Sequence, residues 1–236
     1  MKNRYTDGSY LAGNPAWHAQ DASWKLRHIL RVLDQAGVKD FGCVLDAGCG
    51  SGDIIKEWAV QAPQVQFTGW DISPQAHALA VRNAPCNVQF VQGEKLPLQR
   101  FDLALAIDVI EHIESAEEWM DEFCQRAFLA VLHVPLDLSV YALLRPEILE
   151  QERRSVGHIH FFTTRSLKRF LGAHHCQILA SHYTNKYVEC SPQLASWKSR
   201  LGMFIRKAVH VMLPRSWAAF WVGGYSLMLV IRTPKE

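Results

Sequence analysis

The sequence has 236 residues and a formal net charge of +2, with 49% hydrophobic and 20% charged residues. This length and composition predict a globular chain with one α/β domain and exclude a disordered polypeptide. The net charge is too small to predict binding to nucleic acid, so nucleic acid is not expected as a partner.

The first 135 residues alternate between helical and strand-like patterns. Apolar residues at helical spacing from Leu26 to Leu33 predict a helix before the first cluster of glycines. Short apolar runs beyond it predict strands at residues 41–46, 65–70, 88–91, 101–107 and 128–134. Strands that alternate with helices form parallel sheets through right-handed crossovers. We therefore predict an α/β fold with a doubly wound, mostly parallel sheet and helices on both faces.

The pattern loosens after Pro135. We expect an insertion over 136–157 with a short helix near 142–150, and a later helix that Thr163 or Thr164 caps. Two more strands are expected near 177–181 and over 225–232, with a longer helix around 192–212 between them. Upstream, Ser115 and Glu118 have the spacing of a capping box.

The cysteines and the apolar stretches indicate where in the cell the protein is expected. The six cysteines include no CxxC pair and no metal-ligand spacing, so we expect reduced thiols. The amino-terminal residues lack the apolar core of a secretory signal. The longest apolar stretch, residues 217–230, is too short to span a bilayer and contains two adjacent glycines. These features predict a cytoplasmic protein.

The segment Val44-Leu45-Asp46-Ala47-Gly48-Cys49-Gly50-Ser51-Gly52-Asp53 runs out of the first predicted strand into a glycine-rich turn. A strand that runs into such a turn and then a helix lies at the edge where open α/β sheets bind ligands. The dinucleotide fingerprint requires a small residue where Asp53 stands. Asp46, two residues before the first glycine, suits a positively charged ligand better than a pyrophosphate. The turn therefore favours a ligand with an ammonium or sulfonium group over NAD.

Asp71 ends the second predicted strand. An acid at this position can accept hydrogen bonds from both hydroxyls of a ribose. NAD-dependent enzymes also use an acid here, so Asp71 indicates a nucleoside ligand without choosing one.

Four segments together resemble the successive cofactor motifs of class I S-adenosylmethionine-dependent methyltransferases. They are 44–53, Gly69-Trp70-Asp71, Gly93-Glu94-Lys95-Leu96-Pro97, and the run from Phe101 that ends in Asp108-Val109-Ile110-Glu111-His112. They occur in the family's order and at its spacing. The resemblance implies a Rossmann-like methyltransferase fold with seven strands, an antiparallel last strand, and S-adenosyl-L-methionine as the cofactor.

The resemblance also implies the organisation of the chain as a single methyltransferase domain. Residues 1–38 would form an N-terminal helical extension and residues 39–135 the cofactor-binding core. Residues 136–236 would supply an insertion on the substrate side and the C-terminal completion of the sheet.

The family's motifs assign roles to individual residues. Asp46 and the backbone of the glycine turn would face the methionyl end of the cofactor, and Asp71 would hold the ribose. Glu94 stands where the family commonly has an aspartate that reaches the adenine. The cofactor-binding residues implied are Asp46, Gly48, Cys49, Gly50, Gly52, Asp71, Ile72, Glu94, Lys95, Leu96 and Asp108.

The catalytic residues are inferred from the chemistry of methyl transfer. Alignment of the nucleophile, the methyl carbon and the sulfur supplies most of the acceleration, but a hydroxyl acceptor also needs a general base. Histidine titrates near neutral pH. The candidates are His158, His160, His112, His133 and Asp137. No third ligand with characteristic spacing accompanies the histidines, so no metal site is expected.

The segments expected to contact the methyl acceptor resemble the family more loosely. Residues 10–18 and 135–139 are similar to segments of methyltransferases encoded among bacterial surface-polysaccharide genes. This similarity favours a saccharide or small-metabolite acceptor, methylated on a hydroxyl or an amine. Tyr10 and Trp17 are expected either to cover the cofactor or to pack the extension onto the domain.

Three further hypotheses concern partners and function. Apolar residues near the C-terminus, together with Arg206, Lys207 and Arg215, suggest peripheral contact with a membrane surface. The alternatives to a methyltransferase are a nicotinamide-dependent oxidoreductase and a non-catalytic protein that keeps the cofactor pocket as a scaffold.

Overall fold

The computed structural model describes residues 7, 19–190 and 207–234. Within these residues, seven strands form one sheet in the order β3-β2-β1-β4-β5-β7-β6. All strands are parallel except β7, which runs antiparallel between β5 and β6. The strands are β1 (Cys43–Ala47), β2 (Gln66–Asp71), β3 (Val88–Gln92), β4 (Phe101–Ile107), β5 (Ala127–Pro135), β6 (Gln177–Thr184) and β7 (Ser226–Arg232). The predicted doubly wound seven-stranded sheet with an antiparallel last strand is confirmed.

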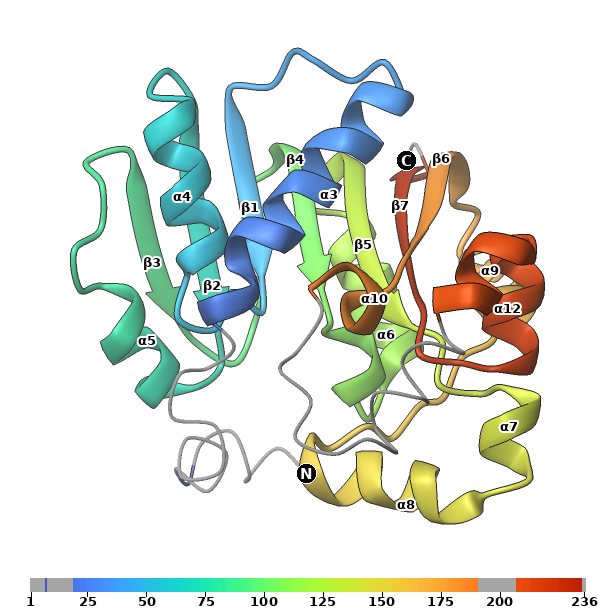
Figure 1. Cartoon of the computed structure of the whole chain (residues 1–236). Helices are drawn as coiled ribbons and strands as arrows, with labels where there is room; N and C mark the ends of the chain where they lie inside the picture. Colours follow the sequence, from blue (N-terminus) through green and yellow to red (C-terminus); the bar gives the residue numbers. More distant parts are fainter. Residues whose placement is uncertain (1–6, 8–18, 191–206, 235–236) are drawn as a thin grey trace.

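Helices cover both faces of this sheet (Figure 1). The described helices are η1 (Ala19–Asp21), α3 (Ala22–Gln35), α4 (Asp53–Gln61), α5 (Pro74–Ala80), η2 (Ile110–His112), α6 (Ala116–Cys124), α7 (Val140–Leu143), α8 (Pro146–Ser155), α9 (Thr164–Ala173), α10 (Lys186–Glu189) and α12 (Arg215–Trp221). On one face α3 and α4 bury Ile29 and Trp58 against the sheet. On the other face α6 and α9 bury Met120, Phe123 and Leu167. Each of these four helices therefore presents one apolar stripe to the sheet, as the helical spacing predicts.

The carboxyl ends of the parallel strands define the functional edge. The glycine-rich turn follows β1 directly, and η2 follows β4 after only two residues. Figure 1 shows α8 lying across this edge, beyond the ends of the strands. α8 buries none of its side chains, so it borders the edge without adding to the core.

Two local predictions are wrong, for identifiable reasons. The single helix expected near 142–150 is two helices, α7 and α8, because Pro146 disfavours helical backbone at Arg145. Ser115 precedes α6 but makes no side-chain capping bond, so the predicted capping box is absent there. A capping box forms instead at α9, where Thr163 and Ser166 each bond the other's backbone N–H.

Some predictions fall outside the described residues. These are the roles suggested for Tyr10 and Trp17 and most of the long helix expected around 192–212. Residues 207–212 of that segment are helical.

Candidate active site

The glycine-rich turn is hydrogen-bonded to the end of β2. Its three glycines have positive φ angles of 80°, 56° and 73° in chain order. The N–H groups of Gly48 and Cys49 both donate to the carbonyl of Trp70, at 2.7 and 3.0 Å. A Cβ atom at Gly48 would lie 2.7 Å from Cγ2 of Val109, so only glycine fits both the backbone angle and the space.

Two acids are buried beside this turn. Asp46 is 2% exposed and Asp71 is 9% exposed. Asp71 accepts hydrogen bonds from the backbone N–H of Gly50 and of Ser73, both at 2.8 Å. Burial raises the pKa of Asp46 to about 7, although Lys25 opposes the rise, and burial also raises the pKa of Asp71. A carboxylate at Asp46 therefore gains stability from any positive charge that a ligand brings.

Asp108, directly after β4, is held in a network of charges. Its backbone has a φ of 57°, which is unusual for a residue other than glycine. Its carboxylate lies 2.7 Å from Nζ of Lys25 and 2.5 Å from Nδ1 of His133. Burial opposes ionisation of Asp108, but His133 and Lys25 outweigh it and hold its pKa below the usual range. Nε2 of His133 lies 2.8 Å from the Thr184 hydroxyl, so the imidazole is fixed at both nitrogens.

A cavity of about 820 Å³ opens at this edge of the sheet. It extends from the glycine-rich turn, past Asp108, to residues of α7 and α8 and to the loop that follows α12. Pockets of this size hold small organic ligands. Its walls contain nine of the residues selected from the sequence, namely Asp46, Gly48, Cys49, Gly50, Asp108, His112, His133, Asp137 and His158.

His158 and Asp137 form a hydrogen-bonded pair in the wall of the cavity. Nδ1 of His158 lies 2.6 Å from Oδ2 of Asp137. Because an ionised carboxylate only accepts hydrogen bonds, the neutral imidazole carries its proton on Nδ1 and has its lone pair on Nε2. The ring of His112 lies 4.9 Å from that of His158, centroid to centroid.

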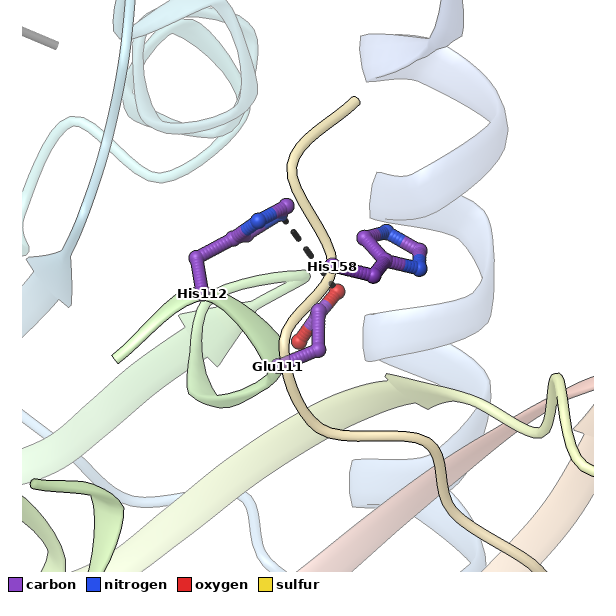
Figure 2. A group of neighbouring side chains, drawn as sticks. All are labelled: Glu111, His112 and His158. Carbon is purple, nitrogen blue, oxygen red and sulfur yellow. Dashed lines mark ion pairs between the residues drawn. The ribbon is translucent and has the colours of Figure 1, made fainter. Parts of the chain in front are cut away.

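Glu111 lies beside these histidines and was not among the candidate residues predicted from the sequence. It is fully buried, with 0% exposure, and neither carboxylate oxygen has a hydrogen-bond partner among the described residues. Its Oε1 lies 3.9 Å from Nε2 of His112 (Figure 2). No third ligand with characteristic spacing accompanies the histidines in the sequence, but in the structure Glu111, His112 and His158 have potential ligand atoms within 4.8 Å of one another.

The remaining candidates lie elsewhere. His160 bonds the carbonyl of Ile113 through Nε2, at 2.8 Å, and does not line the cavity, so we do not retain it as a base. Gly52, Asp71, Ile72, Glu94, Lys95 and Leu96 are also absent from the cavity wall. Leu96 is 2% exposed and belongs to the core, whereas Glu94 and Lys95 are exposed.

Helix α3 contributes polar residues that sequence reasoning missed. Besides Lys25, it carries Trp24, whose ring meets that of His133 edge-on, and His28, which lies 2.7 Å from Glu189 and 2.9 Å from His182. These side chains occupy an otherwise ordinary amphipathic helix, and their partners are up to 165 residues away. No local pattern could have identified them.

The sequence model of a methyltransferase-domain family matches residues 17–181. The chain belongs to this family. The matched range contains the glycine-rich turn, both buried acids, Asp108 and the histidines at the cavity. The methyltransferase is of the class I, S-adenosylmethionine-dependent type, so the oxidoreductase alternative is wrong. No curated protein matches its sequence.

Solved structures share the fold of the methyltransferase. Magnesium protoporphyrin IX methyltransferase from Synechocystis PCC 6803, solved with bound SAH, aligns with a TM-score of 0.57 and 15% identity over 94% of this chain and 86% of that chain. The plantazolicin methyltransferase BamL, solved with a triazolic desmethylPZN analog and SAH, aligns with a TM-score of 0.58 and 16% identity over 96% and 89%. At such identity the likeness concerns the fold alone.

Proposed function

We propose that the methyltransferase binds S-adenosylmethionine along the glycine-rich turn, with Asp46 at the methionyl end and Asp71 at the ribose. The buried carboxyl group of Asp46, with a pKa of about 7, fits a ligand that carries positive charge. Each oxygen of Asp71 accepts one backbone N–H and keeps a further lone pair for a hydroxyl. Ile72, Glu94, Lys95 and Leu96 would then border the adenine, beyond the end of β2.

The acceptor would occupy the cavity between Asp108 and the His158–Asp137 pair, and it would be methylated on a hydroxyl group. One observation carries this proposal: Asp137 fixes the His158 imidazole with its Nε2 lone pair away from the hydrogen bond, in the wall of the cavity. Such a lone pair can activate a hydroxyl. A neutral amine would need no such group.

Each part of the site would have a separate task in this reaction. When bound, S-adenosylmethionine supplies an electrophilic methyl group on a positively charged sulfur. The glycine-rich turn, Asp46 and Asp71 would orient the cofactor. Asp108, fixed by Lys25 and His133, would provide a rigid wall beside it. Alignment within such a wall can contribute about 7–11 kcal/mol to the rate.

The polar lining of the cavity favours an acceptor with several hydroxyl groups, of the saccharide type. Carboxylates of Asp21, Asp137 and Glu152 and the hydroxyl of Ser139 line the acceptor side. Carboxylate oxygens accept hydrogen bonds and therefore suit donors such as sugar hydroxyls. Asp21, Asp137 and Ser139 already bond Lys186, His158 and the backbone of Ala142, and each oxygen-bearing group keeps further lone pairs for such donors.

The test is turnover of radiolabelled S-adenosylmethionine with a matched panel of hydroxyl-bearing and amine-bearing acceptors. We expect labelled methyl on a hydroxyl acceptor, and a fall in kcat of about 10²–10⁴-fold in His158→Ala. His160→Gln is the control, because His160 lies two residues away and outside the cavity. Turnover of amines alone, undiminished in His158→Ala, would overturn the proposal.

We also propose that an exposed apolar surface beside the cavity meets a membrane surface. It consists of Leu144 near α7 and Met212, Trp217, Phe220 and Trp221 near α12, with exposures from 49% to 80%. Helices α7 and α12 pack together, and Arg215 lies at the start of α12. Among the described residues no helix is long and apolar enough to cross a bilayer. Co-sedimentation with anionic vesicles, lost in Trp217→Asp, is the expected result; absence of binding by the wild type would refute it.

A further inference from the structure

We propose that Glu111, His112 and His158 bind a divalent first-row metal ion at the wall of the acceptor cavity. Two imidazoles and one carboxylate form a ligand set that such ions accept. The role given to the ion rests on the proposed hydroxyl methylation, whereas the binding site rests only on these three residues and their surroundings.

The three side chains converge from two segments far apart in the sequence. Glu111 and His112 belong to η2, after β4, and His158 lies in the segment that follows α8. Figure 2 shows the carboxylate of Glu111 directed toward the two imidazole rings. Their potential ligand atoms all lie within 4.8 Å of one another. A metal with bonds of about 2.0–2.2 Å would require these atoms to approach by about an ångström, which side-chain rotation can supply.

Hydrogen bonds orient both histidines as metal ligands. Nδ1 of His112 lies 3.1 Å from the carbonyl oxygen of Gly157, and Nδ1 of His158 lies 2.6 Å from Asp137. Since both partners are acceptors, both Nδ1 atoms carry the proton, and both Nε2 atoms have the lone pair. Histidines that bind metals are held in this way, with the second ring nitrogen bonded to a carbonyl or a carboxylate.

Glu111 supplies the independent observation. Its carboxyl group is completely buried, and neither oxygen accepts a hydrogen bond from the described residues. An unsatisfied buried carboxyl group costs about 1–3 kcal/mol or more, and most native structures avoid it. A cation bound beside it would satisfy both oxygens and remove this cost. The orphaned carboxylate, the convergent lone pairs and their orientation therefore have one common explanation.

The backbone holds the two segments together independently of these side chains. The carbonyl oxygen of Glu111 accepts hydrogen bonds from the N–H groups of Ile159 and His160, at 2.9 and 3.1 Å. The His160 ring adds a bond to the carbonyl of Ile113. These contacts fix His158 opposite Glu111 before any ion binds, which reduces the ordering cost of binding.

The position of the site gives the ion a function. His112 and His158 line the cavity that also contains Asp108, so an ion between them would face the acceptor. With the ion bound, the Nε2 lone pair of His158 would coordinate the metal, so the imidazole would serve as a ligand in place of its role as base. The ion would bind the acceptor hydroxyl and lower its pKa, and the hydroxyl proton would pass to water. The oxygen lone pair would then form the bond to the methyl carbon, while the electrons of the carbon–sulfur bond remain on sulfur.

The test separates metal binding from methyl transfer. Chelator-treated full-length protein is titrated with Zn²⁺ by calorimetry and with Co²⁺ by visible absorption, and S-adenosylhomocysteine binding is measured on the same samples. We expect one equivalent of metal, with Co²⁺ absorption that lacks thiolate charge-transfer bands. In Glu111→Gln and His158→Ala the affinity should fall at least about tenfold, as it does when even supporting residues of metal sites are changed.

His174→Gln is the matched control, because His174 bonds Asp121 and does not line the cavity, and this variant should bind Zn²⁺ as the wild type does. Glu111→Gln preserves the shape of the side chain, and its unfolding midpoint shows whether the variant is folded. Two results would overturn the metal site: the wild type binds S-adenosylhomocysteine but no metal, or both variants bind metal as tightly as the wild type. Either result leaves the methyltransferase assignment intact. Failure to bind S-adenosylhomocysteine would instead contradict the proposed cofactor site.

Discussion

The carboxyl edge of the sheet holds two groups of buried acids that differ in how their charge is balanced. At the ends of β1 and β2, Asp46 and Asp71 have raised pKa values, and no ion pair reaches either acid within the described residues. At the end of β4, Asp108 has a lowered pKa because Lys25 and His133 contact it directly. The first group leaves its negative charge for a ligand to neutralise. The second is neutralised by the protein itself and serves as a rigid wall.

The strongest test of this difference is Asp108→Asn. The substitution leaves Lys25, which is 15% exposed, without its partner, and removing one member of such a pair costs about 3–5 kcal/mol of unfolding free energy. Lys25→Met should cost less, because Asp108 keeps His133. Urea denaturation of both variants measures the two losses. If Lys25→Met lost as much unfolding free energy as Asp108→Asn, or more, the charge of Asp108 would not have the stabilising role proposed here.

Asp71→Ala should act mainly on the ligand. Loss of the charge-assisted hydrogen bonds to a ribose should weaken S-adenosylhomocysteine binding by about tenfold to a thousandfold. Calorimetry measures the affinity, with NADH as the negative control ligand. Asp53→Asn, in the same turn but without a contact expected to the ribose, serves as the matched variant. Equal affinity in Asp71→Ala and the wild type would remove Asp71 from the site.

The pH dependence of binding tests Asp46. Because its pKa is raised to about 7 in the free protein, a ligand cation binds best after the carboxyl group has lost its proton. Affinity for S-adenosylhomocysteine should therefore rise about tenfold from pH 6 to pH 8, with release of a proton on binding. Calorimetry in buffers of different ionisation enthalpy measures that proton. Asp46→Asn should bind more weakly and with a flat pH profile, and a steep profile in this variant would assign the effect to another group.

The smallest expected effect concerns His182 of β6, whose ring bonds His28. Burial, His28 and Arg31 lower its pKa to about 4, so the folded protein binds its proton less readily than the unfolded chain. The stability that it contributes is present above pH 6.5 and is lost as pH falls toward 4. Between pH 7.5 and 5.5 this group should lower the unfolding free energy by about 1 kcal/mol. Denaturation of His182→Gln should show a shallower pH dependence, whereas an unchanged slope would contradict the assignment.

The sequence predicted the cofactor edge better than the acceptor side, for a physical reason. The bounds of β4 match the predicted strand, and the glycine-rich turn lies at the carboxyl end of β1, because these features depend on neighbouring residues. The acceptor side joins residues from α3, η2, β5 and the segment after α8. Glu111 was visible in the motif, but only the packed structure shows that its carboxylate is buried without partners. Pro146 divides the helix expected near 142–150, and this boundary is a local signal that the sequence carries.

The double hydrogen bond to the Glu111 carbonyl has a consequence for amide hydrogen exchange. The N–H groups of Ile159 and His160 belong to no helix or strand, yet both are bonded to the turn after β4. Amides outside regular structure ordinarily exchange rapidly, and these two exchange only when the segment separates from the turn. Their exchange rates therefore report how often the segment that carries His158 separates from Glu111 and His112, and the measurement needs no attached probe.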